Sequence, residues 1–180
     1  MQVRFLGRYE IRGEIGRGNM GVVYRGYDPV IDRMVALKTI ALPDGLGAEA
    51  RRNFVRRFLQ EARIAGKLLH GNIVVTYDAA TDEQTDVPFM VMELVEGEPL
   101  SQRLTQQGAL PWTEALALSI PIARALDYAH RNGVVHRDIK PENISLEVFE
   151  GRDDAVKLLD FGIAQIVDDD AAVSRAGTPG

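Results

Sequence analysis

The sequence contains no cysteine, so a disulfide framework and a thiolate metal site are both excluded. It also has no excess of positive charge: 21 lysines and arginines face 26 aspartates and glutamates, which gives a net charge of −5. This balance argues against nucleic acid as a main partner. No apolar run approaches the roughly 20 residues that a membrane-spanning helix needs. We therefore expect a cytoplasmic protein with no membrane segment within these residues, while an anchor beyond residue 180 is left open.

What the sequence does contain is a strand-rich first part followed by helical patterns. Apolar, β-favouring segments such as Val22–Tyr24 and Val35–Leu37 alternate with turn residues. Further along, apolar residues recur every three or four positions, which is typical of helices. The expected elements are strands within 9–40 and at 73–77 and 89–92, and helices at 48–69, 100–107 and 112–132. The breaking residues at 96–99 predict a boundary between two lobes.

Three glycines, Gly16, Gly18 and Gly21, fit the pattern G-x-G-x-x-G. In a dinucleotide-binding fold the last glycine opens a helix, but here strand formers follow Gly21. The loop is therefore expected to join two antiparallel strands and to lie over phosphates, where any side chain would hold the backbone away from the ligand. Taken alone, a plain glycine-rich hairpin turn fits these residues equally well.

A lysine and a glutamate follow at positions that suit phosphate binding. Lys38 ends the strand pattern Val35–Leu37, and a lysine on a strand can reach phosphates under the glycine loop. Glu61, on the predicted helix at 48–69, is the natural partner to hold its ammonium group. The alternative is that both are ordinary solvated charges, and for Glu61 alone that alternative is the better one.

The densest polar segment is His136–Asn143, and Asp160-Phe161-Gly162 follows it after an apolar run. Phosphoryl transfer needs positioning and cancellation of phosphate charge. Asp138 can orient the attacking hydroxyl, and Lys140 can reach the transferred phosphate. Asn143 and Asp160 offer the oxygen ligands that Mg²⁺ prefers. A charged surface loop is a poor alternative for eight residues in this order.

Together, these segments resemble the signature set of the eukaryotic-type protein kinases, and their style is most similar to bacterial members. Lys140 looks like the serine/threonine subgroup. The resemblance covers residues 9–180 and implies an α+β fold with two lobes. The N-lobe, 9–95, is expected to hold an antiparallel five-stranded sheet with one long helix. The partial C-lobe, 96–180, is expected to be mostly helical and incomplete.

The resemblance also implies roles for individual residues. The three glycines would cover the phosphates of ATP, Lys38 would bind the α- and β-phosphates, and Asp138 would be the catalytic base. Asn143 and Asp160 would hold Mg²⁺. The adenine pocket would be formed by Ile15, Val23, Ala36, Met92, Glu93 and Val95. Arg137 and Thr178 look like the residues that receive a phosphorylated loop and dock the substrate. His136 is expected to pack against the aspartate motif.

Two hypotheses remain open at this point. The first is a Mg·ATP-dependent kinase that phosphorylates serine and threonine in protein substrates during signalling and that can pair with a second copy of itself. The second is a truncated, non-catalytic module that binds nucleotide or a partner. The second arises because the sequence ends at Gly180, before the A-P-E motif of the family, and because Ser145 stands where a large apolar residue is usual. The helix at 112–132 is apolar nearly all round, so we expect an uncovered face and low stability.

Overall fold

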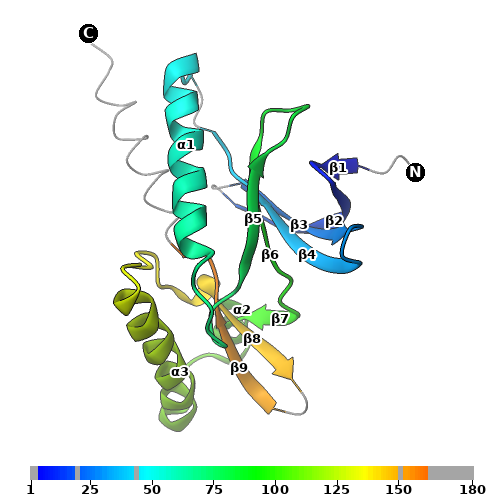
Figure 1. Ribbon diagram of the computed structural model, residues 1–180. Helices are drawn as coiled ribbons and strands as arrows, with labels where there is room; N and C mark the ends of the chain where they lie inside the picture. The colour runs from blue at the N-terminus through cyan, green and yellow to red at the C-terminus, as the bar shows by residue number, and fades with distance from the viewer. Residues whose placement is uncertain (1–3, 19–20, 43–44, 150–151, 162–180) are drawn as a thin grey trace. The chain divides into compact units, whose positions relative to one another are not determined.

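The computed structural model describes residues 4–18, 21–42, 45–149 and 152–161 (Figure 1). Within these residues the chain divides into two units. The first unit comprises residues 4–66 and 76–94, and the second comprises 67–75 and 95–161. The segment from 67 to 75 thus leaves the first unit and joins the second before the chain returns.

The first unit is built on an antiparallel sheet, as the sequence predicts. Its strands are β1 (Arg4–Leu6), β2 (Tyr9–Gly18), β3 (Gly21–Asp28), β4 (Arg33–Thr39), β5 (Thr76–Thr81) and β6 (Pro88–Glu93), in the order β1-β2-β3-β4-β6-β5. The sheet therefore has six strands, where five were predicted. The additional strand, β1, pairs with the start of β2. It has only three residues, which is too few for an alternating pattern to be recognised.

Strand register separates the two faces of this sheet. Val35 and Leu37 on β4 belong to one buried cluster, with Val91 and Phe89 on β6. Tyr9 packs edge-on against Phe89 in the same cluster, with ring centroids 6.1 Å apart. The intervening residues of β4 point to the opposite face, because successive side chains alternate along a strand. The core of the sheet thus lies on the face away from Lys38.

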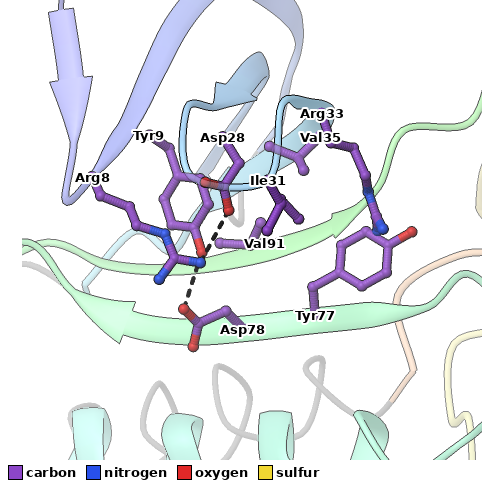
Figure 2. A pocket seen from close by; sticks show the side chains of 9 residues that line it. All are labelled: Arg8, Tyr9, Asp28, Ile31, Arg33, Val35, Tyr77, Asp78 and Val91. Atoms are coloured by element: carbon purple, nitrogen blue, oxygen red, sulfur yellow. Dashed lines mark hydrogen bonds and ion pairs between the residues drawn. The ribbon is translucent and has the colours of Figure 1, made fainter.

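The outer part of that cluster opens into a small pocket of about 170 Å³ (Figure 2). Arg8 donates a hydrogen bond to the buried carboxylate of Asp28 at 3.0 Å, and the Tyr9 hydroxyl donates to Asp78 at 3.0 Å. Burial, and then the bond to Asp78, raise the pKa of Tyr9 to about 12. These pairs connect the beginning of β2 to β3 and β5.

One long helix, α1 (Ala48–Ala65), contacts β5 and β6 in the first unit (Figure 1). Its buried residues are Phe54, Phe58, Ala62 and Ala65. The helix ends at Ala65, earlier than the predicted end near residue 69. Gly66 caps the helix, and its backbone N–H donates to the Ala62 carbonyl at 2.8 Å. The prediction ran too far because Leu69 continues the apolar period in the sequence, although its side chain is 68% exposed in the structure.

Residues 73–77 were predicted as a strand, and the structure corrects this. The strand β5 begins only at Thr76. Ile73 instead makes an isolated parallel bridge with Leu158 in the second unit. Two backbone hydrogen bonds reinforce that bridge, from Val74 to Leu158 at 3.0 Å and from Leu158 to Asn72 at 2.8 Å. The apolar run is therefore shared between the two units, which its sequence pattern does not reveal.

The second unit contains more helix than strand. Its elements are β7 (Gly97–Pro99), α2 (Leu100–Gln107), α3 (Trp112–Arg131), the 3₁₀ turn η1 (Pro141–Asn143), β8 (Ile144–Phe149) and β9 (Arg152–Leu158). The two predicted helices are confirmed, and Gly133 follows α3 with a left-handed φ of 75°. The predicted break at 96–99 proves to contain the short strand β7, which pairs with β8.

Helix α3 is only partly covered by the described residues. Leu118, Ala125 and Ala129 are buried, whereas Leu116 is 52% exposed and Ile120 is 43% exposed. This agrees with the expectation that an apolar helix face would be left open to water. Among the described residues, no helix is both long enough and apolar enough to span a membrane.

Candidate active site

In the first unit, strand register brings the predicted nucleotide-binding side chains to one face. Val23 on β3 lies opposite Lys38 on β4. Two residues earlier on β4, Ala36 lies opposite Met92 on β6. Directly opposed residues in antiparallel strands share a face, and so do residues two apart. Four predicted site residues therefore stand together on the face opposite the buried cluster.

The glycine loop joins β2 and β3 as an antiparallel pair, with Gly18 opposite Gly21. Gly21 is required by the fold: its φ is 134°, and a Cβ would lie 1.9 Å from the Thr39 carbonyl oxygen. Gly16 and Gly18 are different, because a Cβ on either would meet nothing within 4 Å. Steric constraints of the fold do not explain glycine at these two positions, whereas close approach of a ligand to the backbone would.

Thr39, the last residue of β4, lies beside this loop and was not recognised from the sequence. Its hydroxyl accepts a hydrogen bond from the Val22 backbone N–H and donates one to the Val22 carbonyl, both at 3.1 Å. The hydroxyl thus connects the start of β3 to the end of β4, directly beside Gly21. A threonine after a strand lysine is too common a feature to have signalled this role.

Lys38 and Glu61 both lie in the first unit. Lys38 is only 5% exposed, which is rare for a lysine and requires compensation of its charge. Glu61 lies half-buried on α1, one turn after the buried Phe58. It therefore shares a side of the helix with residues that pack inward. The ion pair between Lys38 and Glu61 stays a prediction.

The remaining residues predicted for the adenine pocket lie in different parts of the structure. Ile15 lies beside the glycine loop and is 51% exposed. Glu93 is the last residue of β6, and Val95 follows two residues later, where the chain enters the second unit again. Ser145, where a larger apolar residue is usual in the family, is buried on β8 opposite Pro99.

In the second unit, Asp138, Lys140 and Asn143 meet in one cluster. The Lys140 ammonium group lies 2.7 Å from a carboxylate oxygen of Asp138. The Asn143 amide nitrogen donates to the same oxygen at 2.9 Å and to the Asp138 carbonyl at 2.8 Å. Lys140, and secondarily Asn143, lower the pKa of Asp138, so its carboxylate is ionised at neutral pH. Asp138 in turn raises the pKa of Lys140.

His136 packs against the aspartate motif, as predicted, and thereby supports this cluster. It is 1% exposed and packs edge-on against Phe161, with ring centroids 4.5 Å apart. The Asp138 backbone N–H donates to its Nδ1 at 3.3 Å, so the proton belongs on Nε2, which donates to the Leu159 carbonyl at 2.7 Å. Burial lowers the pKa of His136, which keeps the ring neutral. One side chain thus ties the catalytic loop to the aspartate motif.

The backbone of this region is irregular at two positions that matter. Arg137 has a φ of 66° and Asp160 has a φ of 61°, both in the left-handed region that non-glycine residues rarely adopt. The Leu159 backbone N–H donates to the Asn143 carbonyl at 2.9 Å, which draws the residue before Asp160 to η1. The two predicted metal ligands are therefore linked through one backbone bond.

These residues fit a hard divalent cation. Because the Asn143 nitrogen binds Asp138, the amide oxygen is the atom that could serve as a ligand. Asp160 adds a carboxylate. Among the described residues no group of three or more histidines, aspartates and glutamates could hold a metal ion. A site of one amide and one carboxylate suits Mg²⁺, which usually takes its other ligands from water and substrate phosphates.

Several predicted features lie outside the described residues. They are Asn19 and Met20 of the glycine pattern, Gly162 of the aspartate motif, and Thr178.

Comparison with known proteins gives consistent matches. The protein kinase domain model matches residues 9–180. The serine/threonine-protein kinase PksC of Streptomyces coelicolor is 42% identical over 161 residues, 86% of this chain and 28% of that protein. PrkC of Bacillus subtilis, also a serine/threonine-protein kinase, is 42% identical over 89% of this chain and 23% of its own length. The chain thus spans about a quarter of the length of these curated relatives.

A solved structure agrees. The kinase domain of PknI from Mycobacterium tuberculosis superposes with a TM-score of 0.75 at 31% identity, covering 89% of this chain and 62% of that one. Protein kinases as a family use ATP with a divalent metal ion and act on protein substrates. With the glycine loop, the strand lysine and the catalytic loop in place, the chain belongs to the protein kinase family, among relatives that are bacterial serine/threonine kinases.

Proposed function

We propose that the protein transfers the γ-phosphate of Mg·ATP to serine and threonine hydroxyls of protein substrates. The proposal includes an N-lobe at 9–95 and a C-lobe from 96 onward. The observation that carries it is the cluster of Asp138, Lys140 and Asn143, linked through Leu159 to Asp160. This cluster unites a carboxylate, a cation and two oxygen ligands on one scaffold.

In the first unit, the proposed work is binding and charge cancellation. The bare backbone at Gly16 and Gly18 permits N–H groups to approach phosphate oxygens. Lys38 supplies a positive charge from a buried strand position, where the low dielectric strengthens its attraction for phosphate. Ala36, Val23 and Met92 offer an apolar surface for the adenine ring.

In the second unit, the proposed work is on the attacking hydroxyl and the metal. Asp138 is ionised and can accept a hydrogen bond from the substrate hydroxyl. Its carboxylate would thereby orient the hydroxyl oxygen and receive the hydroxyl proton during transfer. Lys140 can neutralise charge on the transferred phosphoryl group. When bound, Mg²⁺ cancels phosphate charge, and Asn143 and Asp160 would hold it there.

The test is transfer of labelled γ-phosphate from ATP to a protein substrate, followed by phosphoamino-acid analysis. We expect phosphoserine and phosphothreonine from the wild-type protein and at least a roughly hundredfold loss in Lys38→Met, because the substitution removes the phosphate charge partner. Unchanged turnover in Lys38→Met would contradict the lysine's role. Binding of Mg·ATP without any transfer would favour the non-catalytic module.

We further propose a second copy of the chain as a partner, and the pocket face of Figure 2 as the surface involved. Val30 is 71% exposed and Ile31 is 57% exposed beside this pocket. The same face carries both Arg8 and Asp78, and in a two-fold interface a contact between Arg8 and the partner's Asp78 would be made twice. Sedimentation of the protein over a range of concentrations tests this, and a purely monomeric protein would contradict it.

The proposed compartment is the cytoplasm, since ATP is the proposed phosphate donor and the cytoplasm holds the ATP pool.

A further inference from the structure

Arg103 joins three elements of the second unit through two carboxylates. It lies on α2, and its side chain is 18% exposed. Its Nε donates to Glu98 on β7 at 3.0 Å, and its Nη1 donates to Glu114 in the first turn of α3 at 3.2 Å. Glu98, and secondarily Glu114, raise the pKa of Arg103, so its charge is permanent. No motif in the sequence pointed to this triad.

The rigid guanidinium fork explains why arginine suits this place. Nε and Nη1 point in different directions from one plane, so a single side chain can bind two carboxylates from different elements. A lysine ammonium group carries the same charge without that fixed geometry. The pair is also less exposed than Arg131–Asp127 on α3, where the arginine side chain is 77% exposed. Solvent therefore screens the Arg103 triad less.

The strand that Arg103 contacts, β7, is short. β7 has three residues, Gly97, Glu98 and Pro99, and proline cannot donate a ladder hydrogen bond. At Gly97 the strands approach so closely that a Cβ would lie 2.3 Å from the Leu146 carbonyl oxygen. The middle residue, Glu98, pairs with Leu146 on β8 and gives its side chain to Arg103.

This short strand connects two parts of the proposed nucleotide site. Val95, proposed to bind adenine through its backbone, precedes β7 by two residues. β8, which pairs with β7, begins directly after Asn143, the proposed metal ligand. The position of β7 therefore affects both the chain that leaves Val95 and the strand that follows Asn143.

We propose that Arg103 is a positioning residue for nucleotide binding, acting through Glu98 on β7, while its bond to Glu114 anchors α2 to α3. The inference rests on the proposed function, because it assigns Arg103 to the binding of Mg·ATP. It concerns affinity for the nucleotide and assigns Arg103 no part in the transfer step.

The experiment titrates Mg·ATP into the 180-residue chain and its variants, well below their denaturation midpoints. Arg103→Gln and Glu98→Gln are expected to raise the dissociation constant by about fivefold or more. Glu114→Gln is expected to lower the denaturation midpoint and leave the dissociation constant within about twofold. Arg103→Lys should recover part of the affinity, because one carboxylate can still be bound.

Arg131→Gln is the matched control, since it removes an arginine–carboxylate pair from α3 that no site element shares. It should change neither quantity. A dissociation constant that stays at the wild-type value in Arg103→Gln would overturn the proposal and leave a purely structural ion pair. Equal loss of affinity in Glu98→Gln and Glu114→Gln would also overturn it, because the proposal gives only Glu98 the link to the nucleotide.

Hydrogen exchange of the β7–β8 amides separates this inference from the proposed function. If the wild-type chain bound no Mg·ATP, the proposed function would fail, yet exchange would still decide the role of Arg103. Faster exchange at Glu98 and Leu146 in Arg103→Gln, but not in Arg131→Gln, supports the positioning of β7 by Arg103. Unchanged exchange in Arg103→Gln would overturn it.

Discussion

The two units position their site residues in different ways. In the first, Val23, Ala36, Lys38 and Met92 share a face because regular antiparallel strands place them there. In the second, the site residues lie on irregular backbone, which is held by side-chain hydrogen bonds from residues such as His136 and Asn143. Strand register keeps a sheet position in place when its side chain is changed, whereas a loop loses its shape with the side chain that holds it.

Gly21 is an exception in the first unit, because there the fold depends on a single residue. We expect its substitution to have the largest effect on stability. Gly21→Ala should destabilise the protein by about 3 kcal/mol or more, because the Cβ would overlap the Thr39 carbonyl oxygen and φ is unfavourable for alanine. Gly16→Ala, the control, should leave stability within about 0.5 kcal/mol and weaken ATP binding. Urea denaturation and ATP titration measure both, and equal stability losses would mean that the two glycines have the same role.

The second unit should lose stability when a supporting residue is removed. His136→Ala leaves the Leu159 carbonyl and the Asp138 N–H without their partner and opens a cavity beside Phe161. We expect a loss of about 2–4 kcal/mol in unfolding free energy, with turnover reduced as well. Lys38→Met, in the sheet, should lose turnover with little change in stability. If both variants were equally stable, the contrast between the two units would be wrong.

A smaller loss of stability is expected at Thr39, where a side chain stabilises the sheet. Thr39→Val removes the hydroxyl that binds both the N–H and the carbonyl of Val22. The loss should be about 1–2 kcal/mol, accompanied by weaker ATP binding as the glycine loop loosens. Calorimetric melting and ATP titration measure these changes. Affinity unchanged in Thr39→Val would separate Thr39 from the nucleotide site.

Much of the fold could be predicted from the sequence because its signals are local. The helices α2 and α3 follow from apolar periodicity and from Gly133, and β3 and β4 follow from short apolar runs. Strand β1 and strand β7 were missed, since three residues carry no pattern and Gly97 and Pro99 indicate a break. β7 is stabilised by β8, a partner distant in sequence that leaves no local trace, whereas β1 pairs with the strand that directly follows it and is missed only because it is so short.

The candidate site could be predicted as a set of residues, although the way they are supported could not. The order of His136, Asp138, Lys140 and Asn143 is a dense signal that is tied to one chemistry. The roles of Thr39 and Arg103 depend on distances between elements, and the same residue types are common on any surface. The structure was needed to distinguish Gly21, which the fold requires, from the other glycines of the loop.

The most direct test of the account compares Asp138→Asn with Asp160→Asn by calorimetric titration of ATP with and without Mg²⁺, alongside phosphate transfer. Asp138 is proposed to act on the substrate hydroxyl and Asp160 on the metal. Asp138→Asn should keep metal-dependent ATP binding within about threefold and lower transfer by at least about a hundredfold. Asp160→Asn should lose the Mg²⁺ dependence of binding as well as transfer. Identical behaviour of the two variants in both measurements would contradict the assigned division of roles.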